Sequence, residues 1–528
     1  MKPAHTFRKY ADRLLGGESV RRPVPLSGSV PLALIYPNSY AVGMSSLGYQ
    51  TVFRLFNEQP LFQCERAFVY EEPFEYVPLT LETAKTLRSF PLIAFSVAYE
   101  LDLFHAVRLL DSAGIPVLAD ERGPDHPFVL FGGVITFYNP VLFAPMADAV
   151  LIGEAEILVP ELARACEPLS PDRDFRPRLA AELSGKPGFY LPGHHRENGA
   201  VERQWVDLDL TPPSTSFCVP ESSHMKMFMV EVGRGCGRGC RFCAAGHVYA
   251  PFRLWPRRTI IDQVLKFAAP GDRIGLVGAS LSDFRSLDAL CLELQRRGYQ
   301  IGLSSLRADR LSDELLDVLS KSSVRSVSLA PEAGSQRLRR VIRKTLSDDD
   351  ILSAAERIGR AGIEQLKLYF MIGLPFEQQQ DVEAIRTLTE SICRRCTGIR
   401  EIRISINAFV PKPRTPFQWA PMADEKYLKR TRRYLVRSLS SLTRVRVLAK
   451  SARREVVQAL LSNADEAMAH RLATDSEIRT SEAVQKLRRE KHETEVLPWE
   501  RVEKGEETPR LWRSWQEAKK MARYSSNQ

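Results

Sequence analysis

The sequence predicts an α/β protein in which a doubly wound parallel sheet is followed by a partial barrel of six strand–helix units and then by a helical region. Short apolar runs alternate with helix-like segments over residues 31–153, and the same alternation returns over 226–411. Hydrophobic residues make up 44% of the chain and charged residues 26%, as is ordinary for a soluble globular protein. A chain of 528 residues is therefore expected to form two or three domains.

The first part of the chain divides into an N-terminal arm over 1–30 and a sheet domain over 31–160. The expected helices lie at 47–59 and 101–114, and the expected strands at 31–37, 91–97, 115–120, 128–133 and 147–153. Strands separated by helices pair in parallel, and a doubly wound sheet binds ligands in the loops at the carboxyl ends of its strands. Ligand-binding residues of this domain are therefore expected in those loops.

Residues 161–225 are rich in proline and polar residues, which predicts a linker to a second domain over 226–420. Six strands are expected in that domain, at 225–233, 273–280, 300–306, 324–332, 365–375 and 401–411. They lack a Rossmann glycine fingerprint, which favours a partial barrel. Residues 421–528 are expected to form a basic helical region, in which the residues able to dock on a core are Leu497, Trp499, Leu511, Trp512 and Trp515.

Three of the nine cysteines follow the first expected barrel strand: Cys236, Cys240 and Cys243 lie within eight residues and are surrounded by glycines. Together with His247 they could form a closed zinc site with three thiolates and one imidazole. Without His247 they could bind an iron–sulfur cluster and leave one iron open to a substrate. A barrel presents its chemistry at the carboxyl ends of its strands, and this position favours the open site.

The pattern Cys236-x3-Cys240-x-Phe242-Cys243 resembles the signature of the radical S-adenosylmethionine enzymes, and the six strand–helix units resemble the barrel of that family. The resemblance covers about residues 226–420. It implies a [4Fe-4S] cluster bound by the three cysteines, with S-adenosylmethionine chelated at the fourth iron. One electron from the cluster would cleave S-adenosylmethionine to a 5′-deoxyadenosyl radical that abstracts hydrogen. Such an enzyme also implies an electron donor such as flavodoxin or ferredoxin.

The resemblance further implies that S-adenosylmethionine contacts residues at the ends of the later strands. Gly278 and Ser280 end the second strand, where the family often has a glycine-rich motif with an acidic residue that we do not find there. The candidates are Ser304 and Arg307 on the third strand and Glu332 on the fourth. On the fifth strand the candidate is Gly373, in a segment similar to the family's adenine-binding segment. Helix capping, loop hydrogen bonds and a strand-end turn are alternative explanations of the same residues.

The sheet domain resembles a cobalamin-binding domain, in which an Asp-x-His-x-x-Gly loop, a serine loop and a diglycine contact the cofactor. The Asp, His and Gly positions hold Asn38, Tyr40 and Gly43. The serine position holds Ser96, and the diglycine consists of Gly132 and Gly133. The histidine that would ligate cobalt is absent. Cobalamin therefore either binds without a protein nitrogen on its lower face, or the domain has kept the fold and lost the ligand.

If cobalamin binds, the resemblance implies methyl transfer to an unactivated carbon of a substrate that the sequence does not identify. A transfer-RNA methylthiotransferase is a second candidate, although its N-terminal domain normally carries three further cysteines and residues 1–150 contain only Cys64. A zinc-stapled nucleic-acid-binding protein is a third. The net charge of +10 lies largely in helix-like segments interleaved with acids, which favours a solvated face over a nucleic-acid site.

The sequence contains no apolar run as long as a membrane span, and its N-terminus lacks the apolar core of a secretory signal. Clustered cysteines without a disulfide framework are typical of a reducing compartment. We therefore expect a cytoplasmic protein.

Overall fold

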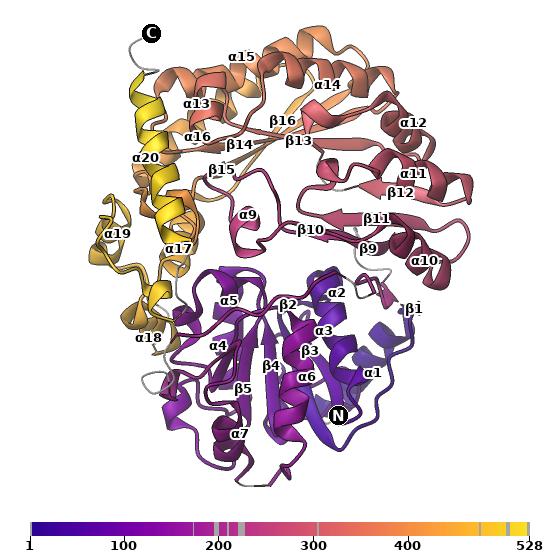
Figure 1. The fold of residues 1–528 in the computed structure, drawn as a ribbon, viewed down its shortest axis with the longest axis vertical. Coiled ribbons are helices and arrows are strands. Elements are labelled where there is room, and N and C mark those ends of the chain that lie inside the picture. Colours follow the sequence, from indigo (N-terminus) through magenta and orange to yellow (C-terminus); the bar gives the residue numbers. More distant parts are fainter. Residues whose placement is uncertain are drawn as a thin grey trace.

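The computed structural model describes residues 3–172, 174–194, 200–208, 211–219, 227–303, 306–474, 477–502 and 507–524. Figure 1 shows two lobes, with the N-terminal sheet domain below and the barrel above. The C-terminal helices lie along one side of the molecule (Figure 1). No helix of the described residues is long and apolar enough to cross a membrane.

The lower lobe contains a six-stranded sheet of order β3-β2-β4-β5-β6-β7. Five strands are parallel and β7 is antiparallel. The strands are β2 (Val30–Ser39), β3 (Phe62–Val69), β4 (Leu92–Ser96), β5 (Phe128–Gly132), β6 (Ala149–Leu151) and β7 (Phe189–Tyr190). The chain leaves β2 for β3 on one side and returns to β4 on the other, so the strand order reverses there. The carboxyl ends of β2 and β4 form the topological switch point, where open α/β sheets bind ligands.

Helices cover both faces of this sheet, which is why β2 reads as a continuous apolar run. Leu32 and Leu34 pack on one face and Ala33 and Ile35 on the other, in two separate apolar clusters. The helices are α1 (Pro3–Gly16), α2 (Tyr40–Met44), α3 (Leu47–Glu58), α4 (Leu103–Ser112), α5 (Val134–Tyr138), α6 (Ala155–Cys166) and α7 (Phe175–Leu183). The doubly wound parallel sheet is thus confirmed.

Several details of the lower lobe differ from the sequence prediction. Residues 115–120 form no strand, because the Arg122 guanidinium takes up the carbonyls of Pro116 and Val117 and the chain turns into a short 3₁₀ segment at Ala119–Glu121. The arm over 1–30 contains α1, whose Phe7 is fully buried. The segment 161–225 begins inside α6 and supplies α7 and β7, so its first thirty residues belong to the sheet lobe and not to a linker.

The upper lobe is a partial barrel made of two four-stranded sheets, β10-β9-β11-β12 and β13-β14-β15-β16, joined through a parallel bridge between Leu306 and Leu329. All pairs are parallel except β10 with β9. The strands are β9 (Met227–Arg234), β10 (Arg253–Leu254), β11 (Arg273–Gly278), β12 (Gln300–Leu303), β13 (Ser326–Glu332), β14 (Gln365–Ile372), β15 (Glu401–Ala408) and β16 (Val445–Ala449). The six predicted strands are confirmed. β16 is an additional strand inside the region predicted to be helical.

The barrel helices pack on the outside, and the C-terminal helices follow them. They are α9 (Ala245–Val248), α10 (Arg257–Phe267), α11 (Leu287–Arg296), α12 (Asp313–Lys321), α13 (Gln336–Val341), α14 (Asp348–Arg360), α15 (Gln379–Arg395), α16 (Glu425–Leu439), α17 (Ala452–Ser462), α18 (Glu466–Thr474), α19 (Ser481–Leu487) and α20 (Thr508–Tyr524). Four of the five predicted docking residues are buried, namely Leu497, Trp499, Leu511 and Trp515. The fifth, Trp512, is partly buried and packs against the same apolar cluster. The C-terminal region therefore shares a core with the barrel.

The C-terminal region also contacts the lower lobe directly. The Asn139 side-chain amide donates to the carbonyls of Ser462, at 3.3 Å, and Ala464, at 2.8 Å. The buried carboxylate of Glu100 pairs with Lys412 and accepts from the Ser462 hydroxyl at 2.6 Å. These contacts connect α17 and the segment after it to the first domain.

Candidate functional site

The three clustered cysteines lie in a loop at the carboxyl end of β9. The loop leaves β9 at Gly235, forms the short helix α9 and returns as β10, which pairs with the end of β9 through Arg253–Arg234 and Leu254–Gly233. The loop is therefore closed at its base by strand pairing.

Two glycines give this loop its shape. Gly235 has φ +77° and Gly239 has φ +65°, which are left-handed conformations that other residues rarely adopt. A Cβ on Gly235 would lie 2.5 Å from the Tyr249 carbonyl oxygen, so the backbone approaches too closely for a side chain. The glycines thus let the loop fold back over its own carboxyl half.

We expect Gly235→Ala to lose most of its bound iron after anaerobic reconstitution, because the substitution strains φ and forces the loop away from Tyr249. Gly237→Ala is the matched control: a Cβ there meets only the Phe252 ring, at 3.7 Å, and no positive φ is required. Iron content per chain and the visible absorption spectrum measure the effect. Equal iron in the two variants would contradict this role of Gly235.

The chemistry of the donor set suits an iron–sulfur cluster. All three cysteines are free and partly exposed. Burial raises the pKa of Cys243 to about 11 and also raises that of Cys240, where Lys344 opposes the shift. Thiolates are the ligands of such clusters, so metal binding here would release protons.

The zinc alternative lacks support in this geometry. No three His, Cys, Asp or Glu side chains in the described ranges are placed to hold one metal ion. A structural zinc needs ligands that converge on one point, whereas a four-iron cluster spreads its thiolates around a larger body. His247 is buried, burial lowers its pKa, and neither ring nitrogen has a hydrogen-bond partner of ordinary geometry among the described residues.

The cationic side chains of the loop are held by carboxylates. Arg234 pairs with Glu231, Glu154 and Glu156, and Arg238 pairs with Asp283. Arg241, between two of the cysteines, is buried and reaches Ser514 and Glu517 on α20. These arginines fix the loop to three different parts of the structure.

The predicted residues on the second and third barrel strands are engaged with nearby carboxylates. The Ser280 hydroxyl donates to Asp283 at 2.6 Å, and the Arg307 guanidinium makes two 2.9 Å bonds to Asp309. Ser304 lies outside the described residues. An acidic residue, Asp283, lies three residues after Ser280, in the same VGASLSD segment, and it pairs with Arg238 of the cysteine loop.

The candidates on the fourth and fifth strands differ in character. Glu332 ends β13 with φ +69°, burial raises its pKa to about 7 against the effect of Lys344, and its carboxylate lies 4.0 Å from the Lys344 ammonium group. Gly373 has φ +71°, and a Cβ there would meet Ala423 and Leu428 at 2.8 Å. Close packing on the start of α16 therefore accounts for Gly373, whereas Glu332 is a buried carboxyl group at the carboxyl end of β13.

The first three predicted residues of the sheet domain pack inside it. The Asn38 amide donates to Asp102 at 2.8 Å, and a Cβ on Gly43 would lie 2.6 Å from the Phe68 ring. The buried Tyr40 hydroxyl donates to Glu18 at 2.7 Å, and Glu18 is also paired with Arg66. The side chain at the histidine position is thus hydrogen-bonded to the internal ion pair of Glu18 with Arg66.

The remaining predicted residues of this domain border two cavities. Ser96, Gly132 and Gly133 line a narrow cavity of about 60 Å³ between the sheet and helices α3 and α6. Ser96 and Gly133 also line a cavity of about 440 Å³, together with Gly278 of the barrel. The structure therefore brings predicted residues of both domains to one place.

This larger cavity, which we call the interdomain cavity, lies where the carboxyl ends of both sheets meet. Its walls include the loops after β4, β5 and β6, the loop before α3, and the ends of β9 and β11; the residues that show this are Ser46, Val97, Gly133, Gly153, Gly235 and Ala279. Both sheets thus present their ligand-binding edges to the same space. The cysteine loop begins on its wall.

The polar wall of the interdomain cavity was missed by the sequence analysis. Glu154 and Glu156 of the lower lobe meet Glu231 and Arg234 of β9 there. Burial raises the pKa of Glu231, against the effect of Arg234. The segment Gly153–Glu156 was a visible signal, but its partners lie about eighty residues away in the chain.

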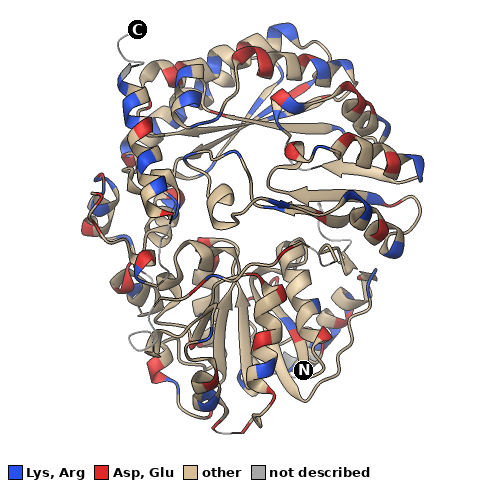
Figure 2. Ribbon diagram, in the orientation of Figure 1, with Lys and Arg blue, Asp and Glu red and all other residues tan. Residues whose placement is uncertain are grey.

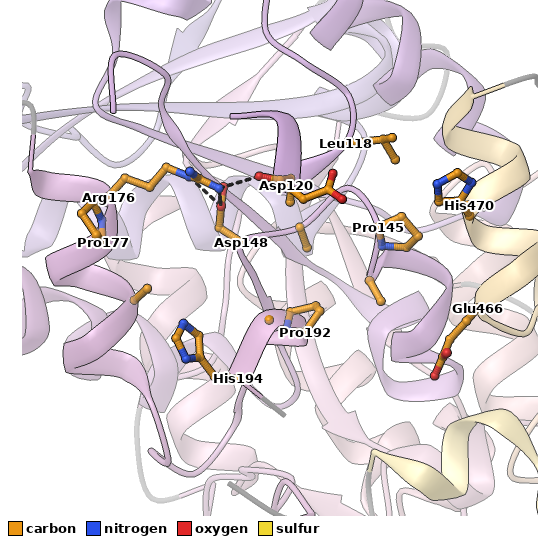
Figure 3. A pocket seen from close by; sticks show the side chains of 15 residues that line it. Leu118, Asp120, Pro145, Asp148, Arg176, Pro177, Pro192, His194, Glu466 and His470 are labelled. Atoms are coloured by element: carbon orange, nitrogen blue, oxygen red, sulfur yellow. Dashed lines mark hydrogen bonds and ion pairs between the residues drawn. The ribbon is translucent and has the colours of Figure 1, made fainter. Parts of the chain in front are cut away.

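A second cavity, of about 530 Å³, lies elsewhere (Figure 3). Figure 3 shows Arg176 against Asp148, with His470 and Glu466 on the facing helix. Asp148 directly precedes β6, so this cavity lies at the amino edge of the sheet, away from the cysteine loop. The interdomain cavity is therefore the better candidate site.

Comparisons with known proteins agree with this geometry. The family model described as "Radical SAM superfamily" matches residues 230–389, and that described as "Radical SAM proteins, N-terminal" matches residues 48–192. The uncharacterized protein MJ0966 of Methanocaldococcus jannaschii is 29% identical over 452 residues, which cover 82% of this chain and 89% of that protein. These matches include the cysteine loop and most of the sheet domain.

Two further similarities are more limited. A tRNA-2-methylthio-N(6)-dimethylallyladenosine synthase of Thermotoga petrophila is 26% identical over 162 residues, or 28% of this chain and 36% of that protein. The solved structure of the cobalamin-dependent S-adenosylmethionine radical enzyme OxsB, with aqua-cobalamin and S-adenosylmethionine bound, has a TM-score of 0.52 at 14% identity and covers 94% of this chain and 80% of its own. At that identity the likeness establishes the fold.

The two family models together match more than half of the chain, and the family implies a [4Fe-4S] cluster and S-adenosylmethionine as cofactors. The cysteine loop carries three free thiols at the expected end of the barrel. The protein therefore belongs to the radical S-adenosylmethionine superfamily, and its N-terminal domain has the fold of a cobalamin-binding domain.

Proposed function

We propose that the protein is a cobalamin-dependent radical S-adenosylmethionine enzyme that transfers a methyl group inside the interdomain cavity. When bound, the cluster supplies the electron that cleaves S-adenosylmethionine to a hydrogen-abstracting radical, and the corrinoid supplies the methyl group. One observation carries the proposal: the ligand-binding edge of the sheet domain and the cysteine-bearing edge of the barrel line one cavity. A substrate held there would be within reach of both.

The chain's own residues have distinct tasks in this proposal. Cys236, Cys240 and Cys243 would hold the cluster. Gly233 and Gly235 allow the backbone on either side of the loop to approach closely, since a Cβ on either would lie 2.6 Å or less from a backbone atom. The ion pairs of Arg234 with Glu154 and Glu156 hold the two walls together. A fixed geometry of this kind orients reactants.

The environment of Tyr40 favours corrinoid binding without a protein ligand on the lower face. Its hydroxyl is bonded to Glu18, which is paired with Arg66, so moving the phenol toward a metal would leave a buried carboxylate and a buried arginine with fewer partners. Such a loss is costly in a buried site. We infer that Tyr40 stabilises the domain and does not ligate cobalt.

The corrinoid's nucleotide tail would insert beside Gly132, between the sheet and helices α3 and α6, where the narrow cavity would have to widen to admit it. A Cβ on Gly132 meets only Leu151, at 3.8 Å, so valine fits the fold but fills the cavity. We expect Gly132→Val to lose at least about 90% of the co-eluting corrinoid absorbance while keeping its iron, because filling a ligand cavity removes binding without touching the cysteine loop. Gly16→Val, at an open position outside the site, is the control.

The function itself is tested on anaerobically purified full-length protein supplied with hydroxocobalamin and a chemical reductant. The expected result is iron and sulfide in equal amounts, a co-eluting corrinoid, and release of 5′-deoxyadenosine from S-adenosylmethionine. A colourless protein with one zinc would contradict the cluster chemistry. Iron with no corrinoid under the same conditions would contradict the methyl-transfer proposal alone.

A further inference from the structure

The region around α16 and β16 carries an unbalanced positive charge. Residues 426–454 contain no Asp or Glu, although the sequence pattern suggested that acids alternate with the bases. Their Lys and Arg residues are Lys426, Lys429, Arg430, Arg432, Arg433, Arg437, Arg444, Arg446, Lys450, Arg453 and Arg454. Figure 2 shows both signs of charge on most outer helices, and this stretch departs from that mixture.

Seven of these cations are exposed and have no ion pair among the described residues. They form what we call the basic surface: Lys426, Arg430, Arg433, Arg437, Lys450, Arg453 and Arg454. The neighbouring carboxylates are already engaged, Glu425 with Lys429 and Arg479, and Glu455 with Arg432. The charge of the basic surface is therefore not neutralised within this part of the chain.

Four of the seven cations form one row on α16. Lys426, Arg430, Arg433 and Arg437 are spaced by four, three and four residues, which places them on one side of a helix, while Leu428 and Leu435 are buried on the opposite side. The row is about 16 Å long, from eleven residues at 1.5 Å each. The partly exposed ring of Tyr434 lies beside it.

The row leads to the mouth of the barrel. β15 and β16 are parallel, so α16 between them runs antiparallel to both, and its first residue lies near the carboxyl edge of the barrel. Lys450, Arg453 and Arg454 follow the carboxyl end of β16, at the same edge. The basic surface thus runs down the side of the barrel from its open end.

At the mouth, the sheet domain continues the pattern with arginine and aromatic residues. The segment Glu100–Asp102 of the sheet domain packs against α17, the helix that carries Arg453 and Arg454, and Tyr99 directly precedes that segment. The Arg108 guanidinium lies 5.3 Å from the Tyr76 ring centre, and the Tyr76 ring stacks on His105. Aromatic rings interleaved with cations are typical of surfaces that bind single-stranded nucleic acid.

We propose that the basic surface binds the backbone of a single-stranded RNA and guides it into the interdomain mouth, so that the substrate of the enzyme is an RNA. A single row of cations suits one strand better than a duplex, and unpaired RNA bases are the form that proteins read by stacking. Arginine, which predominates in the row, pairs well with phosphate. The identification of the RNA as substrate rests on the proposed radical chemistry, whereas binding does not.

An acidic electron donor is the competing occupant. Such a donor has to approach the cysteines, which follow β9, whereas the basic surface surrounds β16 at the opposite end of the strand order. The observations therefore favour RNA.

The test measures binding of a fluorescent, mixed-sequence 30-nucleotide RNA to the full-length protein over a range of salt concentrations. We expect Arg430→Glu/Arg433→Glu/Arg437→Glu to weaken binding at least about tenfold and to lower the slope of log affinity against log salt by about 2, at roughly 0.7 per lost phosphate contact. The matched control is Arg258→Glu/Lys266→Glu/Arg296→Glu, which changes the charge equally on the exposed faces of α10 and α11. Equal losses in both variants would overturn the proposal.

A second variant and a second probe keep the outcome decisive. Lys450→Gln/Arg453→Gln/Arg454→Gln, at the mouth, should also weaken RNA binding, without reversing any charge. Tighter binding of the same sequence as DNA would overturn the assignment to RNA. The assignment would also be overturned if the charge-reversed α16 variant bound RNA normally, kept 5′-deoxyadenosine formation with dithionite and lost it with flavodoxin. That result would identify the basic surface as the docking site of the electron donor. Absence of 5′-deoxyadenosine in the wild type would refute the enzyme function and leave the RNA-binding result standing.

Discussion

Alanine in place of Cys236, Cys240 or Cys243 is expected to reduce 5′-deoxyadenosine formation to the background of the reductant alone. Each substitution removes one of three thiolates that the loop supplies, and a cluster already short of a fourth protein ligand would keep only two. No further cysteine lies in this loop to replace the lost one. The measurement is product formation by chromatography, alongside iron content per chain.

Cys393→Ala is the matched control for these variants. Cys393 is a partly exposed thiol on α15 whose sulfur lies 3.8 Å from the Thr443 carbonyl oxygen, far along the chain from the loop. It should keep the wild-type iron content and activity. Retained 5′-deoxyadenosine formation in any one of the three loop variants would refute the assignment of the cluster ligands.

Glu154→Ala is expected to destabilise the protein by about 3–5 kcal/mol, because it removes the buried carboxylate shared by Arg253 and Arg234, two arginines that are largely shielded from solvent. Glu154 is buried and accepts from Arg253 at 2.6 Å, from Arg234 at 3.0 Å and from the Val206 amide at 2.9 Å. Urea titrations followed by fluorescence provide the measurement. Glu161→Ala on α6 is the control, since its partner Arg164 is exposed and such pairs contribute below about 1 kcal/mol.

The same substitution has a defined pH dependence. Burial alone would raise the pKa of Glu154, but Arg253 and Arg234 outweigh it and hold the pKa below its usual range. A carboxyl group with a lowered pKa in the folded state stabilises the protein above its unfolded pKa and loses that contribution as the pH falls. The stability difference between the wild type and Glu154→Ala should therefore shrink below about pH 4.5. A constant difference down to acid pH would contradict the ion-pair account.

Regular patterns in the sequence were sufficient to predict both parallel sheets. Strands such as β2 and β14 are apolar and bounded by turns or helices, so their position follows from local composition. β3 was missed because it carries Glu65 and Arg66 in its centre, and the burial of Arg66 depends on Glu18 and Glu82. β16 was missed because it is short and contains Arg446. In both strands, pairing with distant parts of the chain determines that a strand forms, and local composition does not indicate it.

The candidate site was predictable where the signal is contained in one loop. The cysteines and their glycines are contiguous, and the structure places them at the end of β9 as expected. Ser280 and Arg307 were predicted as cofactor ligands from the family resemblance and their strand-end positions, and each is bonded to a carboxylate a few residues away. The wall formed by Glu154 and Arg234 could not be read in advance, because it joins two domains across a large separation in sequence.

The contacts of Asn139 and Glu100 with Ser462 bear on how the molecule is assembled during synthesis. The sheet domain leaves the ribosome first, but α17, which fastens it to the barrel, is translated some three hundred residues later. Until then the two facing edges are joined through the ion pairs of Arg234 and Arg253 with Glu154 and Glu156, and the contacts of the C-terminal region with the sheet domain have still to form. The last quarter of the protein therefore fastens the two domains a second time, after the loops that line the interdomain cavity have all been synthesised.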